Sequence, residues 1–363
     1  MKEVLVSDLQ GIKLLTIYLG DKCNFDCVYC DRGYISSLGG QAISIKTKDD
    51  MLEFFSWVAS TPNQIERVSF HGGEPLLFIK RMDEIMEWLQ PLAKQNKWKL
   101  SFTSNGSLVK ENEWFFEKYS GIFAATISFD FMFQQLNREL FDVDAMADVL
   151  NKHCDHWLWQ FVLPIDHPAA FSLDLVENIV YWCYKTNCRV VNVIPLRHKR
   201  GKDKFDVIID RLDLKQFLGG FIEFIQILYI KKLTVFIDGN YDRIDKAYFG
   251  EHQKAVLSPD GYLYPEFDFL EYKVEDSRIG NWRTKELWQN KGDEGRIPDS
   301  CLGCEKRPSC GLKYLYHLFD ETPKGSCKEF YTYVDYAIMH NAKLQEQKTL
   351  LHHIGIANVE INS

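Results

Sequence analysis

Cys23-Asn-Phe-Asp-Cys27-Val-Tyr-Cys30 places three cysteines within eight residues, directly after the apolar run Lys13–Leu19. That run predicts a β-strand, so the three thiols lie on a loop at its carboxyl end. A [4Fe–4S] cluster normally takes four cysteine ligands, and three leave one iron open to an exchangeable ligand. A zinc loop with a distant fourth ligand is the alternative. Structural zinc sites typically pair one CxxC with a second, which is absent nearby.

Outward from this loop, short β-type runs alternate with longer helix-compatible stretches up to about residue 196. This alternation is typical of parallel strands covered by helices. We predict an α/β fold, a partial (β/α)6 TIM-like barrel whose functional residues gather at the carboxyl ends of the strands. The expected strands are Lys13–Leu19, Arg67–His71, Lys99–Thr103, Ala124–Phe129, Leu158–Leu163 and Arg189–Pro195, with helices over Thr47–Ser60, Ile79–Lys94 and Leu212–Ile230.

Composition limits the classes of function. The chain has 363 residues, of which 46% are hydrophobic, so it can bury a large core. It contains neither a signal peptide nor the ~18–20 apolar residues in a row that a membrane span needs, so we expect a cytoplasmic protein with no membrane partner. Ten cysteines in a reducing compartment indicate metal or redox chemistry. A net charge of −8 argues against a nucleic-acid partner.

Polar segments follow the next three predicted strands. They are Phe70-His71-Gly72-Gly73-Glu74-Pro75, Thr103-Ser104-Asn105-Gly106 and Ser128-Phe129-Asp130. Two glycines let a ligand approach the backbone closely, and an ammonium needs acceptors for three donors. Each segment alone is equally typical of a turn or a helix cap.

Together these segments carry a family resemblance. The pattern CxxxCxΦC, with Tyr29 as the aromatic Φ, resembles the signature of the radical S-adenosylmethionine (SAM) superfamily, and Gly72–Pro75 resembles its GGEP element. The resemblance implies a [4Fe–4S] cluster on the three cysteines. It also implies that S-adenosylmethionine is contacted by Tyr29, Gly72, Gly73, Glu74, Pro75, Asn105 and Ser128.

The chemistry that the resemblance implies belongs to the cofactor. An external donor such as flavodoxin or ferredoxin reduces the cluster, and the cluster passes one electron to the bound sulfonium. A C–S bond then breaks, and the resulting 5′-deoxyadenosyl radical abstracts hydrogen from a substrate. The protein positions the target C–H bond and excludes water.

A second group of cysteines, Cys301, Cys304, Cys310 and Cys327, lies in a turn-rich segment. Four thiolates suit either a zinc ion or a fully ligated [4Fe–4S] cluster, and spacing alone does not decide. The segment resembles the SPASM or twitch extension of radical SAM enzymes. That resemblance implies a single auxiliary [4Fe–4S] cluster, because Glu266 and Tyr314 stand where a complete SPASM pattern has cysteines.

Glu266 lies with Asp268 where the extension of this family faces the barrel mouth. Either residue is a candidate catalytic base or substrate contact, and solvated acids are the alternative. The expected domains are a barrel over residues 1–235, an extension over residues 236–335 and a helical tail over residues 336–363.

Enzymes with this layout mostly modify peptides, so a peptide is the expected substrate, with cross-linking, thioether formation, epimerisation or sulfatase-maturase-like oxidation as the reaction. The cysteines begin at residue 23, which leaves no room before them for a leader-binding domain. Radical dehydrogenation or rearrangement of a small alcohol, aminoglycoside or nucleotide is therefore the alternative. A non-catalytic metal-binding protein is a third hypothesis, against which the complete cysteine loop and Glu74 both argue.

Overall fold

The computed structural model describes residues 13–30, 45, 47–60, 65–196, 198–200, 205–208, 212–237, 254–264, 278, 280–287 and 330. Within them, eleven strands form one sheet in the order β13-β12-β11-β10-β1-β2-β3-β4-β5-β6-β9. The central strands are β1 (Leu14–Tyr18), β2 (Arg67–His71), β3 (Lys99–Ser104), β4 (Phe123–Ser128), β5 (His156–Leu163), β6 (Val190–Pro195) and β9 (Thr234–Ile237). A separate hairpin pairs β7 (His198–Arg200) with β8 (Phe205–Val207).

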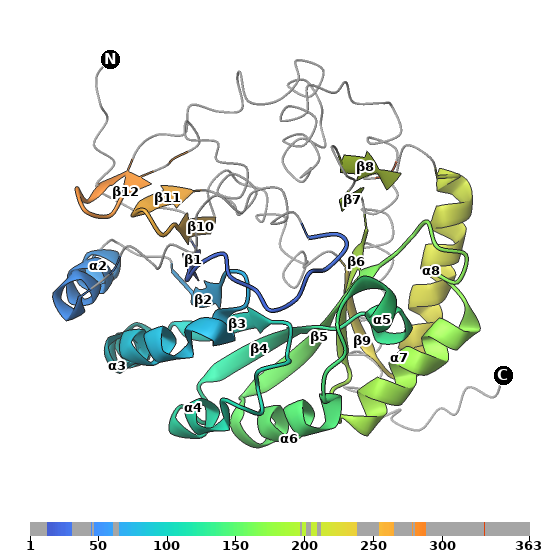
Figure 1. The fold of residues 1–363 in the computed structure, drawn as a ribbon, viewed down its shortest axis with the longest axis horizontal. Coiled ribbons are helices and arrows are strands. Elements are labelled where there is room, and N and C mark those ends of the chain that lie inside the picture. Colours follow the sequence, from blue (N-terminus) through green and yellow to red (C-terminus); the bar gives the residue numbers. More distant parts are fainter. Residues whose placement is uncertain are drawn as a thin grey trace, which may run out of the picture.

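The seven central strands are all parallel, and each pairs with its neighbour in the sheet order. The sheet curves, and the helices cover its outer side (Figure 1). These helices are α2 (Lys48–Ser60), α3 (Ile79–Asn96), α4 (Glu113–Lys118), α6 (Val143–His153), α7 (Leu173–Lys185) and α8 (Leu214–Ile230). The predicted partial TIM-like barrel is confirmed. The main departures are a seventh parallel strand, β9, which was not among the six expected strands, and earlier starts of β4 by one residue and of β5 by two.

Beyond β1 the sheet continues with four short strands, β10 (Lys254–Leu257), β11 (Tyr262–Tyr264), β12 (Gly280–Asn281) and β13 (Glu286–Leu287). Strand β10 is parallel to β1, whereas the later pairs are antiparallel. The turn between β10 and β11 is closed by the Ser258 amide, which donates to the Tyr262 carbonyl at 2.9 Å. The predicted domain boundaries at residues 235 and 335 stay predictions, and the expected helical tail lies outside the described residues.

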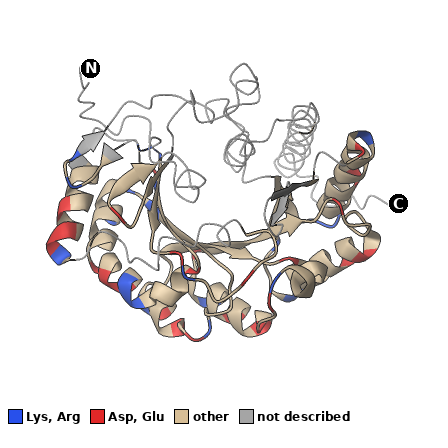
Figure 2. Ribbon diagram, turned by 45° about the horizontal axis from the view of Figure 1, so that its top comes forward, with Lys and Arg blue, Asp and Glu red and all other residues tan. Residues whose placement is uncertain are grey.

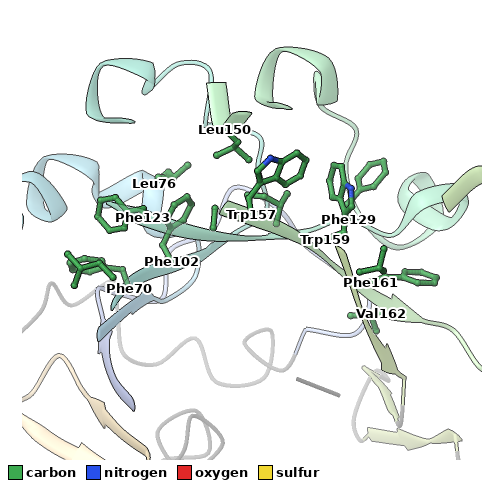
Figure 3. Close-up of a cluster of buried hydrophobic side chains, with 14 of the residues drawn as sticks. Phe70, Leu76, Phe102, Phe123, Phe129, Leu150, Trp157, Trp159, Phe161 and Val162 are labelled. Atoms are coloured by element: carbon green, nitrogen blue, oxygen red, sulfur yellow. The ribbon is translucent and has the colours of Figure 1, made fainter. Parts of the chain in front are cut away.

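Large aromatic side chains form the core on the helix-covered side of the sheet. Figure 3 shows Phe70, Phe102, Phe123, Trp157 and Trp159 projecting from successive strands toward the helices. The Phe102 and Phe123 ring centroids lie 5.8 Å apart in an edge-to-face arrangement, and those of Trp157 and Trp159 lie 4.8 Å apart. Because strand side chains alternate between faces, the residues between these aromatics line the other, concave face.

Side-chain caps fix where several of the outer helices begin. The Asp142 side chain accepts the amide of Ala145 at the start of α6, and the Ser172 side chain accepts the amide of Leu175 at the start of α7. Charged residues lie mainly on these outer helices (Figure 2). In the part of the chain that the model describes, no helix is both long and apolar enough to span a membrane.

Candidate cofactor site

The cysteine loop is held against the glycine-rich segment that follows β2. The Leu19 amide donates to the His71 carbonyl at 2.9 Å, which extends the pairing of β1 with β2 by one residue. The Gly73 amide then donates to the Gly20 carbonyl, and the Glu74 amide to the Lys22 carbonyl, each at 2.8 Å. The loop with Cys23, Cys27 and Cys30 therefore begins from a fixed position at the carboxyl end of the sheet.

The thiols of the loop are placed in chemically distinct surroundings. Cys27 is buried, and burial raises the pKa of its thiol to about 11, although the Arg138 cation opposes that rise. Cys23 is partly exposed, and its sulfur accepts the Phe25 amide at 3.4 Å and the Asn105 side-chain amide at 3.9 Å. Amide donors directed at sulfur are characteristic of thiolates that ligate iron–sulfur clusters, and they tune the cluster's potential.

The donor set fits a cluster. Among the described residues, no group of three Cys, His, Asp or Glu side chains is placed to hold a single metal ion. A [4Fe–4S] cluster takes one thiolate per ligated iron, so its ligands need not converge on one point. The residues that would hold it are Cys23, Cys27 and Cys30.

The fully buried Glu74 side chain connects the ends of strands β2 and β3 by hydrogen bonds. One carboxylate oxygen accepts the Leu76 amide at 3.0 Å and the Ser104 hydroxyl at 2.8 Å, while the other accepts the Asn105 amide at 2.8 Å. Pro75 follows as the first residue of a short 3-10 helix, Pro75–Phe78. The side chain thus joins the segment after β2 to the end of β3, and its predicted contact with the methionine ammonium stays a prediction.

We expect Glu74→Gln to destabilise the protein by about 1–3 kcal/mol, the cost of leaving a buried hydrogen-bonding group without its partner. A glutamine amide has a single acceptor oxygen, so its nitrogen would oppose one of the amide donors that the carboxylate now accepts. Urea unfolding measures the loss. Glu87→Gln is the matched control, since the Glu87 side chain is 57% exposed on α3. Equal stability of the two variants would contradict the role of Glu74 in connecting the two strand ends.

Asn105 connects β3 to the cysteine loop. Its side-chain amide donates to the Asn24 side chain at 2.8 Å, and its side-chain oxygen accepts the Ser107 hydroxyl at 2.7 Å. The Asn24 amide donates in turn to the Ser107 hydroxyl at 2.9 Å, which closes a ring of hydrogen bonds. The structure therefore brings Cys23, Glu74 and Asn105 together, as expected for segments at neighbouring strand ends.

Ser128 belongs to a polar row on the concave face of the sheet. It lies opposite Gln160 in the register of β4 with β5, and Gln160 lies opposite Asn192 in the register of β5 with β6. The Gln160 amide donates to the Ser128 hydroxyl at 3.4 Å. These residues share the face away from the aromatics Trp159 and Phe161, which Figure 3 shows on the helix side. The predicted contact of Ser128 with S-adenosylmethionine stays a prediction.

Behind the cysteine loop lies a buried polar group that sequence reasoning missed. The Tyr29 hydroxyl donates to the Asp130 carboxylate at 2.7 Å and accepts from Arg138 Nε at 2.6 Å. Arg138 Nη1 donates to the Ser128 carbonyl at 2.8 Å, and its Nε lies 3.5 Å from the same Asp130 oxygen. The other Asp130 oxygen accepts the Val162 amide at 3.3 Å. Tyr29 thereby reaches Ser128 through Arg138.

Burial is the largest cause of the pKa shifts of Tyr29 and Asp130 in this group. Burial and the neighbouring carboxylate raise the pKa of Tyr29 well above its usual value, so the phenol keeps its proton. Burial also raises the pKa of Asp130, while the Arg138 cation and the Tyr29 hydrogen bond oppose that rise. Both carboxylate oxygens accept hydrogen bonds, as in an ionised carboxylate. The sequence signal for this group was the place of Asp130 in the Ser128-Phe129-Asp130 segment after a predicted strand.

The remaining predicted site residues lie outside the described residues. They are the candidate catalytic acids Glu266 and Asp268 and the auxiliary-cluster cysteines Cys301, Cys304, Cys310 and Cys327.

Comparison with protein families finds a match over part of the described barrel. Residues 17–153 match the model of the Radical SAM superfamily. This part of the chain is similar to a radical SAM domain. The matched residues contain Cys23, Cys27, Cys30 and the Gly72–Pro75 segment, and they run from β1 to the last residue of α6.

Two curated relatives of the chain come from Methanocaldococcus jannaschii. An uncharacterized protein is 24% identical over 103 residues, which cover 28% of this chain and 34% of that protein. This chain therefore matches about a third of the length of that relative. A probable GTP 3′,8-cyclase is 23% identical over 280 residues, covering 70% of this chain and 84% of that enzyme.

Solved structures share the fold over most of the chain. Native anSMEcpe with bound AdoMet and Cp18Cys peptide has a TM-score of 0.59 at 19% identity, covering 91% of this chain and 98% of that one. Streptococcus suis SuiB bound to the precursor peptide SuiA has a TM-score of 0.56 at 17% identity, covering 89% and 77%. At these identities the likeness concerns the fold.

Proposed function

We propose that the chain is a radical SAM enzyme that reductively cleaves S-adenosylmethionine and abstracts a hydrogen atom from a substrate. The observation that carries this proposal is the clamp between the cysteine loop and the glycine-rich segment, formed by the Gly73–Gly20 and Glu74–Lys22 hydrogen bonds. The clamp holds the start of the three-cysteine loop against the glycine-rich segment. When bound there, the cluster supplies the single electron that breaks a C–S bond of S-adenosylmethionine.

The residues of this chain have the task of holding and orienting these groups. Cys23, Cys27 and Cys30 would ligate the cluster, and Asn105 directs an amide at the Cys23 sulfur. The polar row that begins at Ser128 offers hydroxyl and amide groups to the polar parts of S-adenosylmethionine on the concave face. The aromatic core behind the sheet excludes water from the other side of the same strands.

A peptide is the proposed substrate. Two structures with the same fold hold a peptide, Cp18Cys in anSMEcpe and the precursor SuiA in SuiB. The runner-up is a nucleotide or another small molecule, which the similarity to a probable GTP 3′,8-cyclase favours. Cross-linking, thioether formation, epimerisation and oxidation are all candidate reactions on such a peptide.

The substrate proposal is tested by asking which candidate substrate stimulates the cleavage of S-adenosylmethionine. Reconstituted enzyme with S-adenosylmethionine and a reductant is incubated with short peptides encoded beside its gene, or with GTP, and 5′-deoxyadenosine is quantified. We expect the peptide to stimulate product formation and to gain or lose mass itself, with GTP inert. Stimulation by GTP alone would establish the runner-up instead.

We further propose one auxiliary [4Fe–4S] cluster on Cys301, Cys304, Cys310 and Cys327, acting as an electron relay or a structural staple. Four cysteine ligands close such a cluster, so the substrate would be held by protein groups alone. Anaerobic reconstitution should then give about eight irons per chain, four for each cluster. About four irons with one zinc per chain would overturn the auxiliary cluster and leave the first cluster standing.

The electron would come from an external donor of the flavodoxin or ferredoxin type. We propose a cytoplasmic location, where such donors and a reducing environment for thiols are both available.

A further inference from the structure

The buried group behind the cysteine loop contains a cation paired with a carboxylate. Arg138 is a permanent cation whose side chain is 9% exposed, and Asp130 is fully buried beside it. The Arg138 Nε donates to the Tyr29 hydroxyl at 2.6 Å, and Tyr29 lies between Cys27 and Cys30 in the loop. A buried cation therefore lies beside the loop that would hold the cluster.

The same guanidinium also fixes the geometry of the loop. It binds the Tyr29 hydroxyl through Nε and the Ser128 carbonyl through Nη1, so one planar group connects the loop to the end of β4. A second connection is made by the backbone, because the Val28 amide donates to the Asn137 carbonyl at 3.1 Å, one residue before Arg138. The segment Asn137–Arg138 therefore contacts the loop between its second and third cysteines.

We propose that Arg138 is a positioning residue that raises the reduction potential of the cluster on Cys23, Cys27 and Cys30. The inference rests on the proposed function, because it concerns the cluster of that site. Reduction adds a negative charge to the cluster, and a buried cation stabilises the more negative state. Asp130 has the opposite effect, and it also holds the Tyr29 hydroxyl that receives the guanidinium.

Two variants with opposite expected signs test this inference. Arg138→Met removes the cation at similar length, and Asp130→Asn removes the carboxylate charge while keeping an acceptor for Tyr29. Each is reconstituted anaerobically as the full chain and titrated electrochemically, following the electron paramagnetic resonance signal that changes when S-adenosylmethionine is added. That response separates the first cluster from any auxiliary cluster. Lys118→Met, which removes a lysine 42% exposed in the last turn of α4, is the control.

We expect Arg138→Met to lower the ratio of reduced to oxidised cluster about tenfold at a fixed potential, equivalent to about 59 mV for a one-electron couple. Asp130→Asn should raise that ratio, and Lys118→Met should leave it unchanged. An unchanged ratio in Arg138→Met with normal iron content would overturn the inference. If the Arg138→Met protein takes up no iron, the Asp130→Asn protein alone tests the inference. An unchanged or lower ratio of reduced to oxidised cluster in Asp130→Asn would then overturn the inference.

The same titration separates the two proposals. A wild-type protein without any signal that responds to S-adenosylmethionine would overturn the proposed function and this inference together. A normal response with equal potentials in all variants would remove only the role of Arg138.

Discussion

Cys27→Ala is expected to lose the first cluster and, with it, all cleavage of S-adenosylmethionine above the blank. Cys27 is the buried member of the three thiols, and it is positioned by the loop that Gly20, Lys22 and Val28 fix through backbone hydrogen bonds. An alanine offers no ligand, and a cluster with two remaining thiolates is not held. Iron content should fall by about four per chain, the number in one cluster.

Cys183→Ala is the matched control for this change. Cys183 is also fully buried, but it lies in α7 within the core and has no ligand spacing. Its replacement should leave iron content and cleavage as in the wild type. A Cys27→Ala protein that kept its full iron content would contradict the assignment of the first cysteine loop.

Gly72→Ala is expected to cost about 2–6 kcal/mol of stability, from backbone strain of about 1–3 kcal/mol and overpacking of about 1–3 kcal/mol. Gly72 has a φ of +150°, and a Cβ there would lie 2.5 Å from the Gly20 carbonyl oxygen. That oxygen accepts the Gly73 amide, so relief of the clash would break the clamp that holds the cysteine loop. Reduced iron retention should accompany the loss of stability.

Gly121→Ala is the control that separates the cost of backbone strain from the cost of the steric clash in Gly72→Ala. Gly121 has a φ of +73°, yet a Cβ there meets nothing within 4 Å. It should cost about 1–2 kcal/mol, the penalty of a left-handed conformation alone, and should keep its iron. Urea unfolding and iron analysis of both variants check the prediction, which fails if Gly72→Ala is no worse than Gly121→Ala.

The barrel was predictable because its signals are local. The alternation of apolar runs such as Arg67–His71 with helix-compatible stretches depends on neighbouring residues, and the strand ends carry their turn residues beside them. The predicted strands deviate by a residue or two, as with β5, which begins at His156 instead of Leu158, whereas the parallel strand β9 was not predicted. Ends of elements depend on tertiary pairing, which sequence patterns do not contain.

The contacts within the site were less predictable, for a physical reason. Glu74 was assigned from its motif to a ligand ammonium, but its described partners Ser104 and Asn105 lie about thirty residues away in sequence. Arg138 carries no motif, and its role emerges only where a loop brings it onto Tyr29. Such partners are set by the fold, whereas Cys23, Cys27 and Cys30 were recognised because their spacing is itself the signal.

The most direct test of the central claim is the product of reductive cleavage. Anaerobically reconstituted wild-type protein is mixed with S-adenosylmethionine and dithionite, and 5′-deoxyadenosine and methionine are quantified against the Cys27→Ala protein. We predict that 5′-deoxyadenosine and methionine form in equal amounts with the wild type and that neither forms with the Cys27→Ala protein. A wild-type protein that holds its iron and forms neither product, or a variant that forms both, would contradict it.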